Sequence, residues 1–293
     1  MPRRPVLIVA ATATLLIVAP AAYLVRGDDA GAPRQSPPPP AAAPLPTAGE
    51  AKPPRRRARP KPAWRPRTAP ARAYARRRGG DVSFAVRCGR RSWSFHGRTQ
   101  ARSASTVKVM LLAAYLRSPG VRARALSAGE ASTLNAMITR SDNDAATAIH
   151  ALVGGDGLHA VARRAGMRDF GAAPAWGASR LTAADGARLM LRFARLVPRR
   201  HRERALSLLA GITPYQRWGV ADAVPRGWRL HFKGGWGPPA DGAPAVNHQL
   251  ALLRRGRRRV AVAILISGGV SQAHTSETQR GVAERLLRGL AKH

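Results

Sequence analysis

Two of the few lysines in this chain lie where they could take part in chemistry. The sequence has 50 Lys and Arg residues, of which only five are lysine. Lys108 lies in the apolar run STVKVMLL, three residues after Ser105, so on a helix the two side chains share one face. Burial lowers the pKa of an ammonium group, and a neutral amine beside a serine hydroxyl is a base beside a nucleophile. Arginine stays protonated and cannot replace it.

Taken alone, the Ser105–Lys108 spacing is also compatible with a surface lysine that extends its amine into water. Two further stretches change that balance. Ser141, Asp142 and Asn143 form a polar break between two predicted helices, although such a triplet can also be an ordinary helix cap. Lys233 ends a predicted strand and is followed by two glycines, which would let a ligand approach the backbone, although a simple bulge is the alternative.

The elements that must position these residues can be read from the hydrophobic pattern. Alternating strands are predicted at 81–88 and 91–97, and again at 228–235, 247–255 and 258–267. Helices are predicted between them, with a capping box at Ser127 and Glu130 and a cap at Thr182 and Asp185. An amphipathic helix closes the chain. The pattern predicts an α+β domain, with an antiparallel sheet built from both ends, flanked by helices, and an inserted all-helical lobe.

In this order, S-x-x-K, S-D-N and K-G-G resemble the motifs of the penicillin-recognising serine enzymes, and within them the class A β-lactamases. The resemblance extends over 71–293 and implies the β-lactamase/transpeptidase-like fold. It implies that Ser105 is the acylated nucleophile and Lys108 its base or proton relay. It also implies that Ser141 passes a proton to the leaving nitrogen while Lys233 holds that hydroxyl and attracts a substrate carboxylate.

The same resemblance assigns the remaining site residues. Asn143 would fix the cleft by hydrogen bonds, and the backbone N–H groups of Ser105 and Trp236 would form the oxyanion hole. Gly234 and Gly235 would line the substrate site. No metal and no cofactor are implied, and the substrate would be a small β-lactam or a peptidoglycan peptide.

The chain departs from the family at two points. Class A β-lactamases use a loop glutamate after the S-D-N helix to activate the deacylating water, and no Glu occurs between Ser141 and Thr182. Asp169, the only carboxylate of the segment MRDFGAAPAWGASR, lies too early in the match for that role. Gly234 replaces the usual hydroxyl that binds the substrate carboxylate.

Three interpretations therefore remain open. The chain is a β-lactamase-like hydrolase in which Lys108 or another group serves both half-reactions. Alternatively, it is a penicillin-binding enzyme acting on D-Ala peptides of the cell wall. The third possibility is a wall-binding module that has lost turnover. Trp176 and Trp236 could line the cleft, and His231 and His248 are expected on strand surfaces beside it.

The N-terminal part predicts export. Arg3 and Arg4 precede an uncharged apolar run at 5–25, so residues 1–26 are predicted to be a signal peptide or a membrane anchor. Residues 27–70 are a Pro- and Arg-rich disordered linker, and 71–293 are the catalytic domain. This basic segment is expected to be a solvated linker that repels itself and stays open, and contact with an anionic membrane or wall polymer is the alternative. Export argues against nucleic acid as a partner of a chain with a net charge of +35. The single cysteine, Cys88, excludes an intramolecular disulfide. We expect a monomer.

Overall fold

The computed structural model of the protein describes residues 63–240 and 242–292. The predicted export segment at 1–26 and most of the predicted linker at 27–70 lie outside the described residues. Among the helices that are described, none combines the length and the apolar character needed to cross a membrane.

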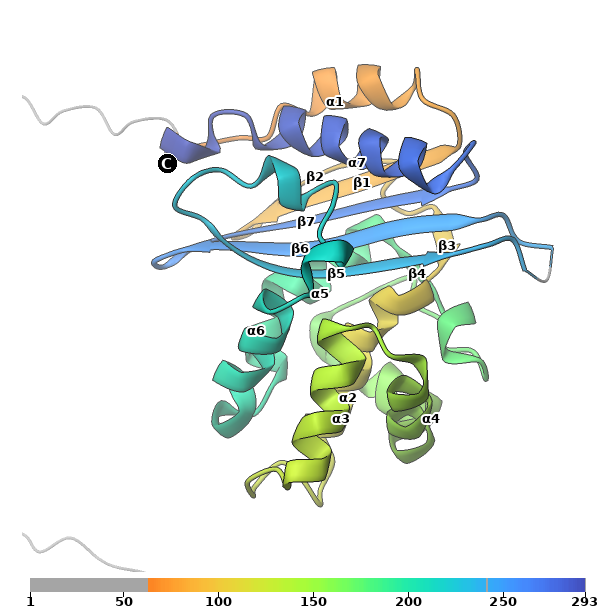
Figure 1. Cartoon of the computed structure of the whole chain (residues 1–293). Coiled ribbons are helices and arrows are strands. Elements are labelled where there is room, and N and C mark those ends of the chain that lie inside the picture. Colours follow the sequence, from red (N-terminus) through yellow and green to blue (C-terminus); the bar gives the residue numbers. More distant parts are fainter. Residues whose placement is uncertain (1–62, 241, 293) are drawn as a thin grey trace, which may run out of the picture. The chain divides into compact units, whose positions relative to one another are not determined.

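A five-stranded antiparallel sheet forms the centre of the described chain (Figure 1). Its order is β2-β1-β7-β6-β5, so strands from the two ends of the domain pair in the middle. Strand β7 is central and pairs on both sides. Its Ile266 lies opposite Val82 of β1, and its Ala263 lies opposite Leu250 of β6. The strands are β1 (Asp81–Cys88), β2 (Arg91–Phe95), β5 (Arg229–Gly237), β6 (Val246–Arg255) and β7 (Arg258–Ser267).

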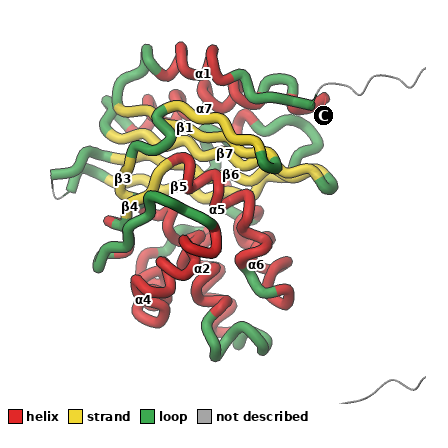
Figure 2. The backbone as a smooth tube through the Cα atoms, turned by 180° about the vertical axis from the view of Figure 1, so that it is seen from behind, coloured by secondary structure: helices red, strands yellow, loops and turns green. Residues whose placement is uncertain are grey.

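Helices cover both faces of this sheet (Figure 2). Helices α1 (Thr68–Ala75) and α7 (Gln272–Leu287) lie together on one face, and α5 (Ala183–Leu196) packs on the other against β1, β6 and β7. Because both faces are covered, β6 and β7 are buried along nearly their whole length, and the polar residues Asn247 and Gln249 of β6 are buried with them.

The helical lobe lies below the α5 face and comes from the middle of the chain (Figure 1). It consists of α2 (Lys108–Arg117), α3 (Ala128–Thr139), α4 (Asn143–Ala165) and α6 (Arg202–Ala210). The predicted α+β architecture, with a sheet from both ends and an inserted helical lobe, is confirmed. The two predicted caps are also present, because Ser127 and Glu130 form a capping box and Thr182 accepts from the Asp185 N–H.

The structure adds two features to the predicted pattern. The sequence pattern predicts two helices here, at 143–155 and 157–166. In the structure they form one element, α4, interrupted at Gly154, whose φ of 60° and ψ of −175° are not helical. A second, two-stranded sheet pairs β3 (Gln100–Arg102) with β4 (Arg180–Thr182). Strands of three residues carry too little alternation to be seen in sequence.

His231 and His248 are buried, and the prediction that they lie on strand surfaces is wrong. The Ile266 N–H donates to Nδ1 of His248, and Nε2 of His248 donates to the carbonyl of Arg102, so the ring is neutral. Burial is the main reason that the pKa of His248 falls to about 4, and backbone hydrogen bonds to Asn247 and Arg102 only partly oppose that shift. This histidine therefore ties β6 to β7 and to β3.

Acidification should destabilise the protein through His248. Its pKa is about 4 when folded and near 6.5 when unfolded, so the unfolded chain binds more protons between these values. The free energy of unfolding should therefore fall, by up to about 3 kcal/mol for this one group, as the pH drops from about 6.5 to 4. In urea titrations across that window, His248→Gln should show a shallower pH dependence than the wild type. Equal slopes for both proteins would contradict this assignment.

Candidate active site

Ser105 lies in a tight turn that leads into the helix carrying Lys108. Residues Ala104–Val107 form a 3₁₀ turn, η1, and α2 begins at Lys108. In 3₁₀ geometry the side chains at positions i and i+3 eclipse each other, which places Ser105 and Lys108 on one line. Ala104 has a φ of 45°, so a left-handed residue sets the direction of the turn. The Ser105 N–H is in the first turn, where N–H groups have no intrahelical partner.

The Lys108 ammonium is buried and faces the S-D-N segment. Its Nζ donates to the Ser141 carbonyl at 2.6 Å and to Asn143 Oδ1 at 2.8 Å, and it lies 3.4 Å from Ser141 Oγ. No hydrogen bond between Lys108 Nζ and the Ser105 hydroxyl is recorded among the described residues. Catalytic hydrogen bonds are often long in proteins without substrate. Lys108, three residues after Ser105, therefore remains the candidate base, although Ser141 and Asn143 hold its amine in this structure.

Lys233 approaches the same hydroxyl from the sheet. Its Nζ lies 2.8 Å from Ser141 Oγ and 2.8 Å from the carbonyl oxygen of Gly234. Ser141 Oγ is therefore contacted by two amines, one from α2 and one from β5. The tertiary fold joins residues that are 33 and 92 positions apart in the sequence.

Both amines have a lowered pKa. Burial lowers the pKa of Lys108 to about 8, and the neighbouring Asp142 carboxylate partly opposes that shift. Burial also lowers the pKa of Lys233 well below its usual value, and the charge of Lys108 lowers it further. Because the two groups share one hydroxyl, protonation of one disfavours protonation of the other. A neutral amine is thus accessible here near pH 8, as a general base requires.

Ser141 occupies a conformation that normally belongs to glycine. Its φ is 60°, and it lies between the last residue of α3 and Asp142, the N-cap of α4. The Asp142 N–H donates back to the Ala136 carbonyl, six residues earlier, which closes the C-terminal end of α3. A left-handed non-glycine residue costs on the order of 1–3 kcal/mol and is found mainly at functional sites. The strain directs the Ser141 hydroxyl toward both amines.

Two substitutions at Ser141 should separate strain from chemistry. Ser141→Gly and Ser141→Ala both remove the hydroxyl, but only glycine fits the positive φ without strain. We expect the glycine variant to unfold with a free energy about 1 kcal/mol higher than that of the alanine variant. Both variants should acylate about 10²–10⁴-fold more slowly than the wild type, because the proton path is lost in each. Chemical denaturation and acylation kinetics on the pair measure the two effects, and equal stabilities would refute the strain.

Gly235 brings strand β5 directly against the turn that carries Ser105. A Cβ atom at this position would lie 2.8 Å from the Ser105 nitrogen and 2.7 Å from the Thr106 nitrogen, which is closer than real side chains allow. Only glycine lets the strand and the start of η1 approach this closely. The next residue on the strand is Trp236, so the N–H groups of Ser105 and Trp236 belong to two segments in backbone contact.

The loop after α4 brings an aromatic ring, and no carboxylate, to Lys108. The Trp176 ring lies over the amine, with its centroid 4.8 Å from Nζ, and its indole N–H donates to Thr147 Oγ1 at 3.2 Å. Asp169, the carboxylate of this loop, pairs with Arg98 at 2.6 Å. Trp176 therefore covers the base, while Asp169 is engaged by a different partner.

Sequence reasoning missed Trp218. A Cβ atom at Gly234 would lie 3.3 Å from Cη2 of Trp218, so the indole fills the space beside the position where the family usually has a hydroxyl. Trp218 also meets the Trp236 ring edge-on at 5.1 Å between centroids, and its indole N–H donates to Gln279 Oε1. The segment TPYQRWG gave no motif that could have revealed this contact, because it depends on how the chain between α6 and β5 folds back.

The sequence comparison decides the family. The sequence model of the beta-lactamase enzyme family matches residues 125–290, which is more than half of the chain. The chain belongs to this family. It is a β-lactamase-like serine hydrolase by family, and the matched region contains the S-D-N and K-G-G segments. None of the curated proteins compared with the chain matches it.

Solved structures agree with the family on the fold. A β-lactamase from Sphaerobacter thermophilus DSM 20745 is 20% identical, with a TM-score of 0.63 over 75% of this chain and 95% of that one. A β-lactamase from Xanthomonas campestris pv. campestris is 19% identical, with a TM-score of 0.62 over 76% and 97%. A representative of class A β-lactamase from Bacteroides cellulosilyticus is 11% identical, with a TM-score of 0.66 over 78% and 98%.

Proposed function

We propose that this family member is an exported serine acyl-transfer hydrolase that opens β-lactams or related D-Ala-type amides through an acyl-enzyme on Ser105. One observation carries the proposal: the amines of Lys108 and Lys233 meet at the single hydroxyl of Ser141, next to the turn that presents Ser105. The uncharged run at 5–25, preceded by two arginines, supports export and leaves a cleaved signal and a retained anchor as alternatives.

The proposed acylation moves one proton around a short circuit. Neutral Lys108 takes the proton of the Ser105 hydroxyl while Oγ attacks the amide carbon. The carbonyl oxygen becomes an oxyanion between the N–H groups of Ser105 and Trp236. Lys108 then returns the proton through Ser141 Oγ to the leaving nitrogen, the C–N bond breaks, and an ester on Ser105 remains. Lys233 and Asn143 hold Ser141 and Lys108 in place.

The substrate side differs from the family pattern at Gly234. No hydroxyl is available there for a substrate carboxylate, and Trp218 fills the adjacent space. A carboxylate would have to interact with Lys233, whose lowered pKa it would raise on binding. We therefore propose that the aromatic pair Trp218 and Trp236 selects substrates by apolar contact, together with a weaker contribution from charge.

Deacylation is the slow step in this proposal. The loop after α4 places Trp176 at Lys108, and the Asp169 carboxylate is paired with Arg98. Lys108 is then the remaining base for the attacking water. This supports a second candidate function, a penicillin-binding type of enzyme that acylates with β-lactams and releases the product slowly. A wall-binding module without turnover is the third reading.

One experiment separates these three functions. A protein that starts at residue 63 keeps Trp64, whose indole N–H donates to the Arg288 carbonyl. After addition of a β-lactam, intact mass and drug concentration are followed together. Drug loss without lasting adduct supports the hydrolase, and a persistent adduct on Ser105 supports the penicillin-binding type. If neither is seen and Ser105→Ala changes no activity on wall peptides, both enzyme proposals fail.

The rate of acylation should rise with pH up to about 8. The reactive form is neutral Lys108, whose pKa is about 8, so the neutral fraction falls roughly tenfold for each pH unit below that value. At pH 6 the acylation rate should be about a hundredfold below its plateau. Stopped-flow acylation across pH 5.5–9.5 measures this limb. A flat profile would show that Lys108 does not supply the base.

A further inference from the structure

A large basic hollow lies at the end of the sheet where two hairpins turn. It measures about 1190 Å³. Arg90 and Arg91 reach it from the β1–β2 hairpin, and the consecutive arginines 257–259 reach it from the β6–β7 hairpin. Arg192 and Arg195, at the C-terminal half of α5, also line it. Lys292, near the C-terminal end, is the last cation of the lining. Four segments that are distant in sequence thus bring cations to one concave surface.

The positive charge of this basic hollow is not neutralised within the described residues. Its lining holds eight cations and no Asp or Glu. The four ion pairs recorded for residues 63–240 and 242–292 involve other arginines. Arg254 lies in β6 just before the β6–β7 hairpin. Burial lowers the pKa of Arg254, and repulsion by the charges of Arg259 and Arg229 lowers it further. A cluster of this kind attracts a ligand that carries several negative charges.

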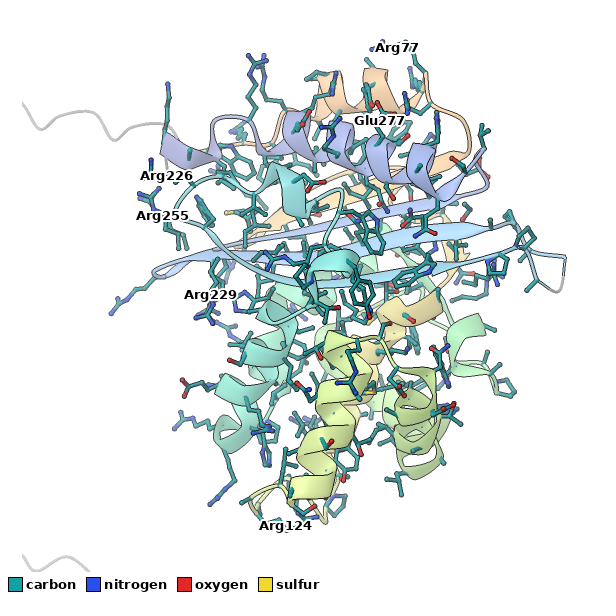
Figure 3. All side chains as sticks on the ribbon, in the orientation of Figure 1. Arg77, Arg124, Arg226, Arg229, Arg255 and Glu277 are labelled. Atoms are coloured by element: carbon teal, nitrogen blue, oxygen red, sulfur yellow. The ribbon has the colours of Figure 1, made fainter. Side chains whose placement is uncertain are left out.

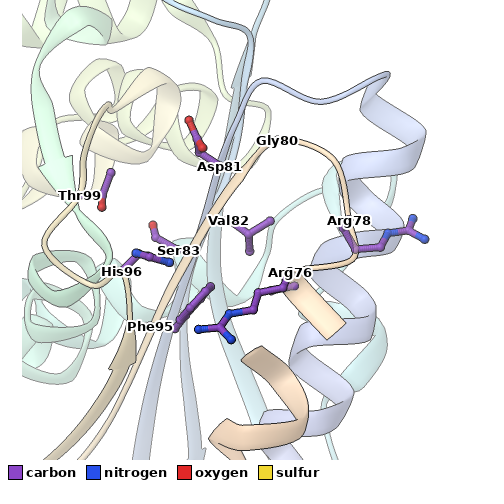
Figure 4. A pocket seen from close by; sticks show the side chains of 10 residues that line it. Arg76, Arg78, Gly80, Asp81, Val82, Ser83, Phe95, His96 and Thr99 are labelled. Carbon is purple, nitrogen blue, oxygen red and sulfur yellow. The ribbon is translucent and has the colours of Figure 1, made fainter. Parts of the chain in front are cut away.

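A smaller hollow shows what an internally neutralised site looks like. It measures about 310 Å³ and lies between α1 and the first two strands (Figure 4). Asp81 lies in its lining, and Arg78 pairs with Glu277 at 2.9 Å. Cations and carboxylates are mixed there, so it lacks the single sign of charge that distinguishes the basic hollow.

Two tryptophans give the basic hollow an apolar wall. Trp64 and Trp228 line it, and Trp228 is only 7% exposed. The indole N–H of Trp228 is buried and has no acceptor among the described residues. This nitrogen is itself buried, so the two tryptophans contribute apolar surface to the wall and no hydrogen bond to a ligand.

We propose that the basic hollow binds a linear phosphate polymer through its charged backbone. Arginine forks pair two-pronged with phosphate oxygens, and cations from four segments match charges repeated along a chain. A concave surface with Trp228 buried in its wall suits a chain lying in the hollow and does not suit insertion into a flat bilayer. Two aromatic residues, one of them buried, offer no row of stacking platforms for nucleic-acid bases.

This site is separate from the proposed catalytic residues. Trp228 precedes the first residue of β5, whereas Gly235 and Trp236 lie near its other end, about 20 Å away at the usual rise per residue. Arg226, Arg229 and Arg255 flank the same end of the sheet (Figure 3). A bound phosphate polymer would hold the protein in place and leave Ser105 free to react.

The test compares two variants of the full chain that lose equal charge. The pocket variant carries Arg→Gln at 90, 91, 257 and 258, all exposed. The control carries Arg→Gln at 77, 122, 163 and 280, which are exposed and lie outside the hollow. Binding of inorganic polyphosphate of about twenty units is measured by titration at several salt concentrations. We expect the pocket variant to bind at least tenfold more weakly, with the slope of log K against log salt reduced by up to about 3. The control should change less than threefold.

Three results would overturn the proposal. Equal weakening in both variants would show that overall charge, and no built site, binds the polymer. Pocket-dependent binding to vesicles with one third phosphatidylglycerol, without pocket-dependent polyphosphate binding, would assign the site to a membrane. Tighter pocket-dependent binding of a twenty-base oligothymidylate than of polyphosphate would assign it to nucleic acid.

Discussion

Replacing Lys108 by methionine is expected to slow acylation of Ser105 by about 10³–10⁴-fold, at the upper end of what a general base contributes. Methionine keeps the length and apolar packing of a fully buried side chain but has no amine. The acyl-transfer reaction then has no group to take the Ser105 proton, and the pH dependence near 8 should disappear with it. Stopped-flow mixing with a chromogenic β-lactam measures the rate.

The structure provides a check that the Lys108→Met variant is folded. The substitution removes a buried amine, which favours stability, but leaves the Ser141 carbonyl and Asn143 Oδ1 without their donor. These effects oppose each other, so we expect the free energy of unfolding to change by less than about 2 kcal/mol. Lys108→Arg restores a permanent charge and should stay inactive. A folded Lys108→Met protein that acylates within tenfold of the wild type would refute the role of Lys108.

Gly235→Ala is expected to slow acylation by at least about 10²-fold, because misplacement of the reacting groups by about 1 Å has effects of that size. The new methyl would lie 2.7 and 2.8 Å from two backbone nitrogens of η1, and neither can move without moving Ser105. Strand β5 and the turn must separate, which displaces the N–H groups of Ser105 and Trp236. Overpacking should also lower the free energy of unfolding by about 1–3 kcal/mol.

The strand offers a matched control for this substitution. Gly237 lies two residues further along β5, so its Cβ would point to the same face. That Cβ would meet Arg102 Nη2 at 3.7 Å, an ordinary contact. Gly237→Ala should therefore retain the acylation rate within about threefold. Equal rates for Gly235→Ala and Gly237→Ala would refute the requirement for close approach at Gly235.

Some parts of the fold follow from local sequence. The cap at Thr182, the capping box at Ser127 and the apolar periods of α5 and the closing strands are local features, since a cap depends on residues three apart and a strand on alternation. Pairing of strands from both ends followed from the order of elements. The pattern predicted two helices, at 143–155 and 157–166, whereas the structure joins them in α4 and places the interruption at Gly154.

Other parts depend on contacts that sequence cannot show. The three-residue strands β3 and β4 exist because each satisfies the other's backbone, and His231 and His248 are buried because helices cover both faces of the sheet. Neither fact is encoded in the few residues around those positions. Alternation of polar and apolar residues indicates that one face of a strand is buried. Whether the other face is also buried depends on which helices pack against the sheet.

The residue types available for chemistry are readable along the chain: a serine three before a lysine, an S-D-N triplet, a K-G-G strand and no glutamate in the loop. Motifs of this kind are local because each occupies a single turn or strand end. The meeting of Lys108 and Lys233 at Ser141, the position of Trp176 over Lys108 and that of Trp218 beside Gly234 follow from the tertiary structure alone. These are contacts between distant segments, and they arise from packing the helical lobe against the edge strand β5.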